Sequence, residues 1–428
     1  MEFVKRVVPQ GIKNIYHYLQ AFLAALFYGF PSRKLKVIGI TGTDGKTTTV
    51  SLAYHILKSA GVKASMISSV KAVIGQASLD TGFHVTTPSP LELQKYLNMM
   101  VKAGSDVALL EVTSHGLDQG RVAFIDFFEG VVTNVTREHL DYHKTYKRYL
   151  EAKSKILNDV KFRILNADDP SFEELSKKGS GQMLSFGVRG DADFTAKNIN
   201  QSEKYTNFDV KIKGREKQEK TLNIATPLYG EFNISNCLAA IAISKTFDVE
   251  DATIVSSLKE FPGVEGRMER IDEGQKFQVI IDFAHTPNSF EHTLKSLKKA
   301  AKNKLICVFG AAGERDKSKR AVMGNIAGRI CNYSILTAED PRHENVNDII
   351  GEIAKGLEEA GGVLGSTYWK IPDRAKAIRE AIISLASDGD TVVLLGKGHE
   401  KSLNLEGVEY PWSDQISARN ALLEKLKK

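Results

Sequence analysis

The chain has 428 residues, of which 42% are hydrophobic and 26% charged, with a formal net charge of +6. These values are ordinary for a soluble globular protein of two or three domains. The mild positive charge suits anionic small molecules such as nucleotides, and it is too diffuse to favour a nucleic-acid partner. The three cysteines (Cys237, Cys307 and Cys331) have no metal or redox spacing, so we expect reduced core residues in a cytoplasmic protein.

Residues 1–35 are predicted to form a short N-terminal helical segment, in which residues 15–30 read IYHYLQAFLAALFYGF. This stretch is too short and, with His17 and Gln20, too polar to span a bilayer, and it lacks the cleavage site of a signal peptide. Two interpretations remain. The helix packs on the first domain, or it is a basic, aromatic-rich helix in peripheral contact with a membrane surface.

The most informative segment follows a predicted strand at Lys36–Ile40 and reads TGTDGKTT at residues 41–48, before a helical pattern. A strand, a glycine loop and a helix N-terminus in this order present backbone N–H groups to a phosphate. Lys46 is expected to reach the β- and γ-phosphate oxygens, and Thr47 to hold Mg²⁺. The spacing departs from the general G-x-x-x-x-G-K-[ST] pattern because position 40 is Ile. The context still predicts a nucleoside triphosphate site.

Residues 36–262 alternate between strand and helix patterns, which predicts a P-loop-type central α/β domain with a mostly parallel sheet. Residues 191–225 alternate apolar and polar side chains and predict a small antiparallel β insert. The expected strands are Lys36–Ile40, Asp106–Glu111, Gly130–Val135 and Phe162–Asn166, and the expected helices are Leu91–Ala103, Tyr146–Leu157 and Ile234–Phe247.

Pro262-Gly263, a motif typical of a hinge, precedes a second α/β pattern, so residues 263–428 are predicted to form a Rossmann-like C-terminal domain. Each predicted strand ends in polar or glycine-containing residues. In open α/β sheets, ligands bind beyond the carboxyl ends of the strands, so these ends predict a site. The expected strands are Gln278–Asp282, Lys304–Phe309, Tyr333–Thr337 and Thr391–Leu395.

Two polar segments in the central domain also follow predicted strands. Glu111 opens the first, and a carboxylate beside a phosphate loop is a natural Mg²⁺ ligand; the alternative is a capping or solvated glutamate. The second, TNVTREHLD at residues 133–141, contains His139, which would bind a second metal ion or cap the loop.

Taken together, the ordered motifs resemble the Mur ligase superfamily over about residues 36–428. Those enzymes are ATP-dependent, amide-forming ligases of peptidoglycan synthesis. The likeness is greatest to the MurE type, which adds the third amino acid to a UDP-N-acetylmuramoyl dipeptide. The family loop also explains the unusual spacing at residues 41–48. The matching segments read GTDGKTT, EVTSHGLDQGR, TNVTREHLDYH, NADD, GEFNISN, GRME, DFAHTP, GAAGERDKSKR, PDR and GKGHE.

The resemblance implies a role for each matching residue. Lys46, Lys153, His139 and Arg267 are implied to be catalytic, with Lys153 carbamylated by CO₂. Metal ligands are implied at Thr47, Glu111, His139 and Lys153. ATP contacts are implied at Gly42, Thr43, Gly45, Lys46, Thr47, Thr48, Asn233, Asn236, Arg267 and Asp282. Substrate contacts are implied at Thr86, Thr87, Ser114 and Arg121 for the sugar peptide, and at Arg315, Asp340, Arg342, Gly396 and Glu400 for the amino acid.

One motif indicates which amino acid the enzyme would add. MurE-type enzymes that use diaminopimelate carry a D-N-P-R segment, whose arginine matches the distal carboxylate at two points. This chain reads Glu339-Asp340-Pro341-Arg342, so Arg342 favours meso-diaminopimelate over lysine, while Asp340 departs from the family asparagine. The alternative interpretation of this segment is a turn with a surface salt bridge.

Only about 35 residues precede the phosphate loop, where the family has a UDP-binding domain. Two further functions therefore stay open: a Mur-like ligase for a lipid-linked precursor, and a folylpolyglutamate-type ligase, although the latter typically carries a G-K-G-S loop. A non-enzymatic ATP-binding scaffold is a third. We expect a monomer whose partners are ATP, a UDP-muramoyl peptide and an amino acid.

Overall fold

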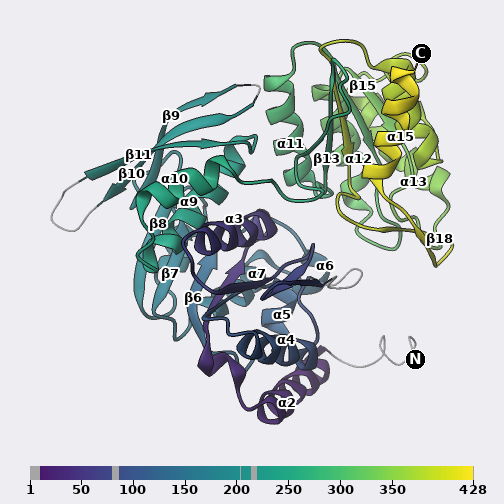
Figure 1. Cartoon of the computed structure of the whole chain (residues 1–428). Helices are drawn as coiled ribbons and strands as arrows, with labels where there is room; N and C mark the ends of the chain where they lie inside the picture. The colour runs from purple at the N-terminus through teal and green to yellow at the C-terminus, as the bar shows by residue number, and fades with distance from the viewer. Residues whose placement is uncertain (1–9, 80–85, 203, 214–218, 428) are drawn as a thin grey trace. The chain divides into compact units, whose positions relative to one another are not determined.

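The computed structural model describes residues 10–79, 86–202, 204–213 and 219–427 (Figure 1). The chain divides into two compact units. The first comprises Met1–Pro227 and Glu231–Pro262, and the second comprises Leu228–Gly230 and Gly263–Lys428. Each unit has its own sheet and is described by itself.

The described part of the first unit is built on an 11-stranded sheet in the order β11-β10-β9-β8-β7-β6-β1-β5-β2-β3-β4. The strands from β9 to β2 in this order pair in parallel, and antiparallel strands extend both edges. The bounds are β1 Lys36–Thr41, β2 Ala64–Ile67, β3 Ala72–Ile74, β4 Ala77–Leu79, β5 Val107–Glu111, β6 Phe127–Val132, β7 Phe162–Asn166, β8 Gln182–Gly187, β9 Phe194–Gln201, β10 Thr206–Lys213 and β11 Glu219–Thr226.

The predicted strands agree closely with β1, β5 and β7, but β6 runs from Phe127 to Val132 instead of Gly130 to Val135. The sequence patterns did not indicate β2, β3, β4 and β8. Beyond Val132 the backbone turns to side-chain partners, since the Thr133 carbonyl accepts from Asn166 Nδ2 at 2.9 Å. Thr133 Oγ1 donates to Asp44 O at 2.6 Å, and Val135 N donates to Asp169 Oδ2 at 3.1 Å. The predicted antiparallel insert is β9–β11, and it continues the main sheet because β9 pairs in parallel with β8.

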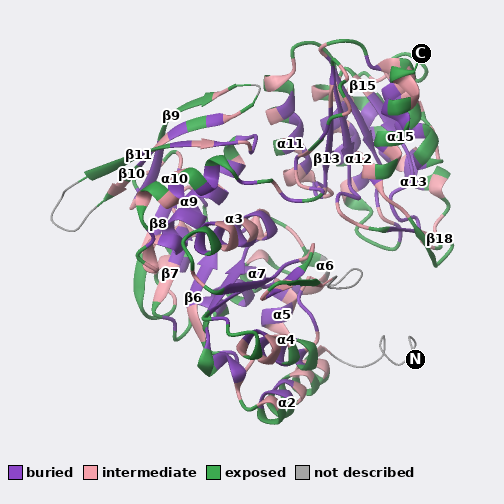
Figure 2. Ribbon diagram, in the orientation of Figure 1, coloured by how far each residue is buried: buried purple, intermediate pink, exposed green. Residues whose placement is uncertain are grey.

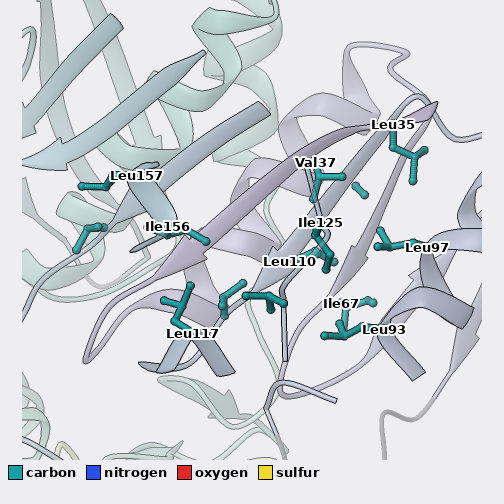
Figure 3. Close-up of a cluster of buried hydrophobic side chains, with 14 of the residues drawn as sticks. Leu35, Val37, Ile67, Leu93, Leu97, Leu110, Leu117, Ile125, Ile156 and Leu157 are labelled. Carbon is teal, nitrogen blue, oxygen red and sulfur yellow. The ribbon is translucent and has the colours of Figure 1, made fainter. Parts of the chain in front are cut away.

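Helices cover this sheet, and their apolar faces complete its core. In the cluster of Figure 3, Leu93 and Leu97 of α4 lie with Val37 of β1 and Leu110 of β5, and all four are buried. The helices are α2 Gln10–Tyr28, α3 Lys46–Ser59, α4 Pro90–Lys102, α5 Ser114–Asp118, α6 Leu140–His143, α7 Tyr146–Ser154, α8 Phe172–Ser176, α9 Glu231–Thr246 and α10 Asp251–Lys259, with 3₁₀ turns at Pro31–Lys34 and Lys155–Leu157.

The N-terminal segment contains α2, which packs on α4, as one of the two interpretations of that segment requires. No helix within the described ranges is long and apolar enough to cross a membrane.

The second unit contains a six-stranded sheet in the order β12-β13-β17-β14-β15-β16, parallel except for the edge strand β12, and a two-stranded β18-β19 ribbon. All four predicted strands are present here. The bounds are β12 Glu269–Ile271, β13 Gln278–Asp282, β14 Leu305–Phe309, β15 Tyr333–Leu336, β16 Tyr368–Lys370, β17 Thr391–Leu395, β18 Ser402–Leu405 and β19 Val408–Pro411, with helices α11 Pro287–Ala300, α12 Ser318–Ile330, α13 Val346–Glu359, α14 Arg374–Arg379 and α15 Asp414–Leu426, and a π-helical turn at Glu380–Leu385.

A buried ion pair ties the strand ends of this second sheet together. Arg374 is fully buried and lies 2.6 Å from Asp414 through its Nη2 atom. The same guanidinium donates to the carbonyls of Ala338 and Leu395, each at 3.1 Å. Arg374 therefore fixes the chain beyond β15 against the end of β17.

One buried carboxyl group in the first sheet makes stability depend on pH. Glu129 of β6 is fully buried and accepts a hydrogen bond from Thr246, and burial raises the pKa of Glu129 to about 8. Since the ordinary pKa is 4.5, the protonated form favours folding at low pH, and this contribution is lost as the pH rises through about 8.

We expect Glu129→Gln to remove this loss because the amide stays neutral at every pH. The free energy of unfolding of the variant, relative to wild type, should rise between pH 5 and pH 8 by ~1–4 kcal/mol, since each pKa unit corresponds to ~1.4 kcal/mol. Urea unfolding at several pH values measures the difference, and parallel curves for the two proteins would contradict the prediction.

Candidate active site

The phosphate loop joins β1 to α3. The helix begins at Lys46, directly after Gly45, whose φ of 84° is a left-handed conformation that favours glycine. The ammonium group of Lys46 donates to the carbonyls of Gly42 at 3.1 Å and Thr43 at 2.9 Å, so this side chain folds over the loop. Thr47 and Thr48 lie in the first turn of the helix, whose backbone N–H groups and dipole favour an anion.

Strand register brings Glu111 to this loop. Glu111 is the last residue of β5 and pairs with Ile40 of β1, two residues before Gly42. Its carboxylate is 3% exposed and accepts from Thr47 Oγ1 at 3.1 Å, so it is neither solvated nor a helix cap. Two oxygen donors of the kind that Mg²⁺ prefers therefore lie in contact beside the loop.

Ser69 is a residue of this site that the sequence motifs did not indicate. Both its backbone N and its Oγ donate to Glu111, each at 2.8 Å, and its Oγ lies 3.1 Å from Thr86 Oγ1. It follows β2, and only the pairing of β2 with β5 places it beside Glu111. Ser69 thus connects a predicted metal ligand to a predicted substrate residue.

The opposite side of the loop rests on the chain after β6. Asn134 Oδ1 accepts from Thr43 N at 3.2 Å and Asp44 N at 2.9 Å, while its Nδ2 donates to Asp44 O at 3.1 Å. A Cβ atom at Gly42 would lie 1.8 Å from Thr133 Oγ1, so no side chain fits there. Asn134 is a second residue that motif assignment missed, although its position after a strand is a signal.

Two of the predicted ATP contacts, Asn233 and Asn236, lie on α9 against the same loop. A Cβ atom at Gly45 would lie 2.3 Å from Asn236 Oδ1, which also accepts from Thr49 Oγ1 at 3.3 Å. Asn236 Nδ2 donates to Asn233 Oδ1 at 3.0 Å. Both amides are buried, so α9 supports the loop through a polar contact.

Lys153 lies on α7 and is 1% exposed, with its Nζ 4.6 Å from the centre of the Tyr149 ring. Within the described ranges it has no ion-pair partner. Burial, followed by the charge of Lys46, lowers the pKa of Lys153 well below its ordinary value. Burial therefore favours the neutral form of this amine, which is the nucleophilic form.

His139 precedes α6 and does not cap it through its side chain. Its ring centre lies 4.8 Å from that of His115 and 6.2 Å from that of Tyr149, whose hydroxyl is 3.0 Å from Thr43 Oγ1. Tyr149 is therefore next to His139, Lys153 and the phosphate loop.

The four predicted metal ligands fall into two neighbouring groups. Thr47 and Glu111 are in direct contact, and His139 and Lys153 adjoin Tyr149. Among the residues that the structure describes, no three His, Cys, Asp or Glu side chains are arranged to hold a metal ion. Thr47 and Glu111 still fit Mg²⁺ bound together with a nucleotide, since Mg²⁺ usually keeps waters and takes phosphate oxygens beside one or two protein ligands.

The predicted sugar-peptide residues gather at the end of β5. Arg121 Nη1 donates to the carbonyl of Thr87, and Thr87 Oγ1 lies 2.9 Å from Thr113 Oγ1. Ser114 Oγ lies 3.0 Å from His143 Nε2. Arg121 Nε is buried with no hydrogen-bond partner in the described chain, and burial lowers the pKa of this guanidinium. A buried donor of this kind suits an anionic or carbonyl ligand.

In the second unit, Asp282 ends β13 and pairs with Leu395 of β17, so Gly396 follows directly beside it. Gly396 N donates to Asp282 O at 3.1 Å. The Asp282 carboxylate accepts from Met268 N at 2.8 Å, and burial raises its pKa although Arg267 opposes this shift. The Arg267 guanidinium stacks on the Phe283 ring at 4.4 Å.

The segment that carries Asp340 and Arg342 is held by a buried cation. Lys397 is fully buried, and its Nζ lies 2.8 Å from Asp340 Oδ1 and 2.6 Å from Glu400 Oε2. Asn404 N also donates to Asp340 Oδ1, at 2.9 Å. The interpretation of this segment as a turn with a surface salt bridge is therefore wrong, because the pair is internal. Lys397, which the motif GKGHE contains, neutralises the aspartate that departs from the family pattern.

Arg342 follows in a left-handed conformation, with φ of 54°, and its backbone N donates to Asn404 O at 3.2 Å. Its guanidinium makes no ion pair with any residue in the described part of the chain. Arg315 lies on the adjoining loop. This loop is bound to the Asp340 segment by a hydrogen bond from Gly313 N to Asp340 O at 2.8 Å. The two arginines are thus carried by loops in direct contact.

Comparison with known proteins identifies the family to which this chain belongs. The Mur ligase middle domain matches residues 40–244, and the Mur ligase glutamate ligase domain matches residues 266–398. The UDP-N-acetylmuramyl-tripeptide synthetase of Roseiflexus sp. (strain RS-1) is 39% identical over 94% of this chain and 81% of its own length. The chain belongs to the Mur ligase family. The resemblance read from the motifs is confirmed, and the chain is an ATP-dependent amide-bond ligase of this family.

Two further Mur ligases carry a more specific name. The UDP-N-acetylmuramoyl-L-alanyl-D-glutamate–2,6-diaminopimelate ligase of Bacillus licheniformis is 37% identical over 94% of this chain and 82% of its own length. A solved structure with the same enzyme name is 30% identical, with a TM-score of 0.64 over 92% of this chain and 79% of that chain. The family's two-domain α/β fold, predicted from the sequence, is therefore confirmed.

We expect Gly42→Ala to weaken ATP binding at least about tenfold, or ~1.4 kcal/mol, because the new methyl group displaces Thr133 and with it the loop. Isothermal titration of ATP into the purified protein measures the effect. Gly351→Ala is the matched control, since a Cβ atom there meets nothing within 4 Å. Equal ATP affinity of the Gly42→Ala variant and wild type would show that the loop does not bind the nucleotide.

Proposed function

We propose that the protein adds meso-diaminopimelate to UDP-N-acetylmuramoyl-L-alanyl-D-glutamate, with ATP converted to ADP and phosphate. One observation carries the proposal. Thr47 of the phosphate loop is linked through Glu111 and Ser69 to Thr86, so groups suited to ATP and groups suited to an acceptor share one edge of one sheet. We infer the substrates from the relatives that bear this enzyme name.

In the proposed reaction, a carboxylate oxygen of the acceptor attacks the γ-phosphorus of ATP, and the bond to the β–γ bridging oxygen breaks. This step yields an acyl phosphate and ADP. Lys46 and the first turn of α3 stabilise the charge that develops on the phosphoryl oxygens. A bound Mg²⁺, held by Thr47 and Glu111, would supply further charge neutralisation.

The amino group of diaminopimelate, once deprotonated, then attacks the acyl carbon. The amide bond forms, and inorganic phosphate leaves. Arg121 and Ser114 are assigned to the acceptor, because they lie at the end of the strand that carries Glu111. The UDP-linked acceptor and ATP are cytoplasmic metabolites, so we place the reaction in the cytoplasm.

We propose that the side chain of Lys153 carries a carbamate. The neutral amine attacks CO₂ and loses a proton to solvent, so the uncharged side chain becomes an anion with two oxygen atoms. The lowered pKa of Lys153 and the nearby charge of Lys46 both favour this product. His139 and the carbamate would then hold a second cation on the side of Tyr149, where the side chains alone offer too few ligands.

Amino-acid selection is assigned to the second unit. Arg342 is the arginine expected to bind the distal carboxylate of diaminopimelate, with Arg315, Gly396 and Glu400 completing the pocket. The pairing of Asp340 with Lys397 leaves its negative charge compensated, so it does not repel that carboxylate. Asp282, Arg267, Asn233 and Asn236 are assigned to ATP.

Phosphate release tests the function. With ATP and UDP-muramoyl dipeptide, we expect turnover with meso-diaminopimelate and little with lysine, and none with folate and glutamate. Arg342→Ala should raise KM for diaminopimelate by roughly 10- to 100-fold, since hydrogen bonds to charged groups contribute ~1.5–3 kcal/mol. Arg379→Ala is the matched control, because Arg379 pairs with Glu424 at the surface of the same unit.

Equal rates with diaminopimelate and lysine would reject the specificity. Activity only with a lipid-linked acceptor, or with folate and glutamate, would reject the acceptor and favour one of the alternatives left open by the sequence.

We expect Lys153→Ala to lower kcat by about 100-fold or more, a change of ~2.7 kcal/mol in the barrier, with partial rescue by acetate, which replaces the missing carboxylate. Lys155→Ala, two residues away and half-exposed, is the control. Thermal melting shows whether each variant is folded. Full activity of Lys153→Ala would remove the carbamate from the mechanism.

A further inference from the structure

Helix α2 presents its apolar side to solvent. Eight large apolar or aromatic residues recur every three or four positions, as on one side of a helix. Phe27 is 78% exposed and Leu23 is 63% exposed. Exposed residues along α2 are green in Figure 2. This outward face of α2 consists of Ile12, Ile15, Tyr16, Leu19, Phe22, Leu23, Leu26 and Phe27.

The opposite side of α2 is made of small and polar residues. Ala21, Ala24 and Ala25 are its buried residues. Asn14 Nδ2 donates to Asp118 O at 3.2 Å. A surface helix of a soluble protein normally buries its large apolar residues and exposes its polar ones, so the polarity of α2 is reversed.

Contacts with the first unit hold α2 in this orientation. Tyr18 and Phe22 pack on Phe124, with ring centres 5.0 Å and 5.3 Å apart, and α2 lies along α4. The alanines allow this close approach. Phe22, which is 41% exposed, lies at the edge of this packing, and the other large residues of the outward face point away because the packing uses the opposite side of the helix.

The charged residues around α2 indicate which kind of partner the outward face would contact. Residues 3–43 contain six Lys or Arg and no Asp or Glu. Within the described part of that segment, Lys34 is exposed, and Arg33 pairs with Asp126 at 3.4 Å. A positive segment that flanks an apolar helical face complements a bilayer with anionic headgroups.

We propose that the outward face of α2 inserts into the headgroup region of an anionic membrane and anchors the protein peripherally. The helix lies in the plane of the interface, with Tyr16 and Phe27 at headgroup depth and the exposed Lys34 near lipid phosphates. Asp118, which the inward side of α2 contacts, would then sit about one helix diameter, ~10 Å, from the membrane. This inference does not depend on the substrates proposed above.

Sedimentation with vesicles tests the anchor. The full-length protein is mixed with vesicles of phosphatidylcholine alone, or with 30 mol% phosphatidylglycerol, a fraction of about one third chosen to supply surface charge. We expect binding to the anionic vesicles, at least about fivefold weaker binding to the neutral ones, and a decrease with added salt. The double variant Leu23→Glu/Phe27→Glu should lose binding.

The matched control is Val363→Glu/Ile416→Glu, which places the same charges at two apolar residues of the second unit that are 57% and 63% exposed. It should bind as wild type does, and both variants should melt at the wild-type temperature because all four positions are at the surface. Equal loss in the two double variants, or no binding of wild type to either vesicle, would overturn the proposal.

Light scattering on the lipid-free protein provides the remaining outcome. The membrane anchor predicts that the lipid-free protein is a monomer, which is also the oligomeric state expected from the sequence. A dimer that Leu23→Glu/Phe27→Glu dissociates, without vesicle binding by wild type, would mean that a second copy of the chain covers this face and would overturn the membrane anchor.

Discussion

The site of the first unit depends on the register of three parallel strands. Pairing of Ile40 with both Glu111 of β5 and Val131 of β6 puts the residues after each strand at one level. The loop after β1 therefore meets a carboxylate on one side and Thr133 and Asn134 on the other. A shift of one residue in either pairing would turn these side chains to the other face of the sheet.

Buried cations recur in both units, and their partners differ in a way that matters for chemistry. Arg374 and Lys397 each have carboxylate partners, so their charges are compensated and they serve to hold loops. Lys153 has no such partner in the described chain, and another cation, Lys46, acts on it. Removing a charge from water without compensation is expensive, so an unpaired buried lysine is expected to lose its proton or to be modified. The same residue type is thus structural in one place and reactive in another.

Helix α2 shows a different kind of constraint. Its alanine side packs on the first unit, and its eight large residues are each at least 41% exposed, although Phe22 also contacts Phe124. Since exposed apolar area is unfavourable in water, a sequence that keeps eight such residues on one face implies an environment other than water for that face. The amphipathic pattern of a helix reveals which side is apolar, and only the packed structure shows that this side faces outward.

The sequence by itself determined the central strands of both sheets, the phosphate loop and the order of motifs, because these are local patterns of hydrophobic period and turn chemistry. It also determined the family, since many short segments in one order are matched. It could not place Ser69 beside Glu111 or Asn134 beneath the loop, because strand pairing joins residues that are distant in the chain. Nor could it reveal that Lys153 makes no ion pair with any described residue, or that Asp340 is neutralised by Lys397 inside the protein. Burial and charge pairing are properties of the assembled sheet and its loops, and only the tertiary structure decided them.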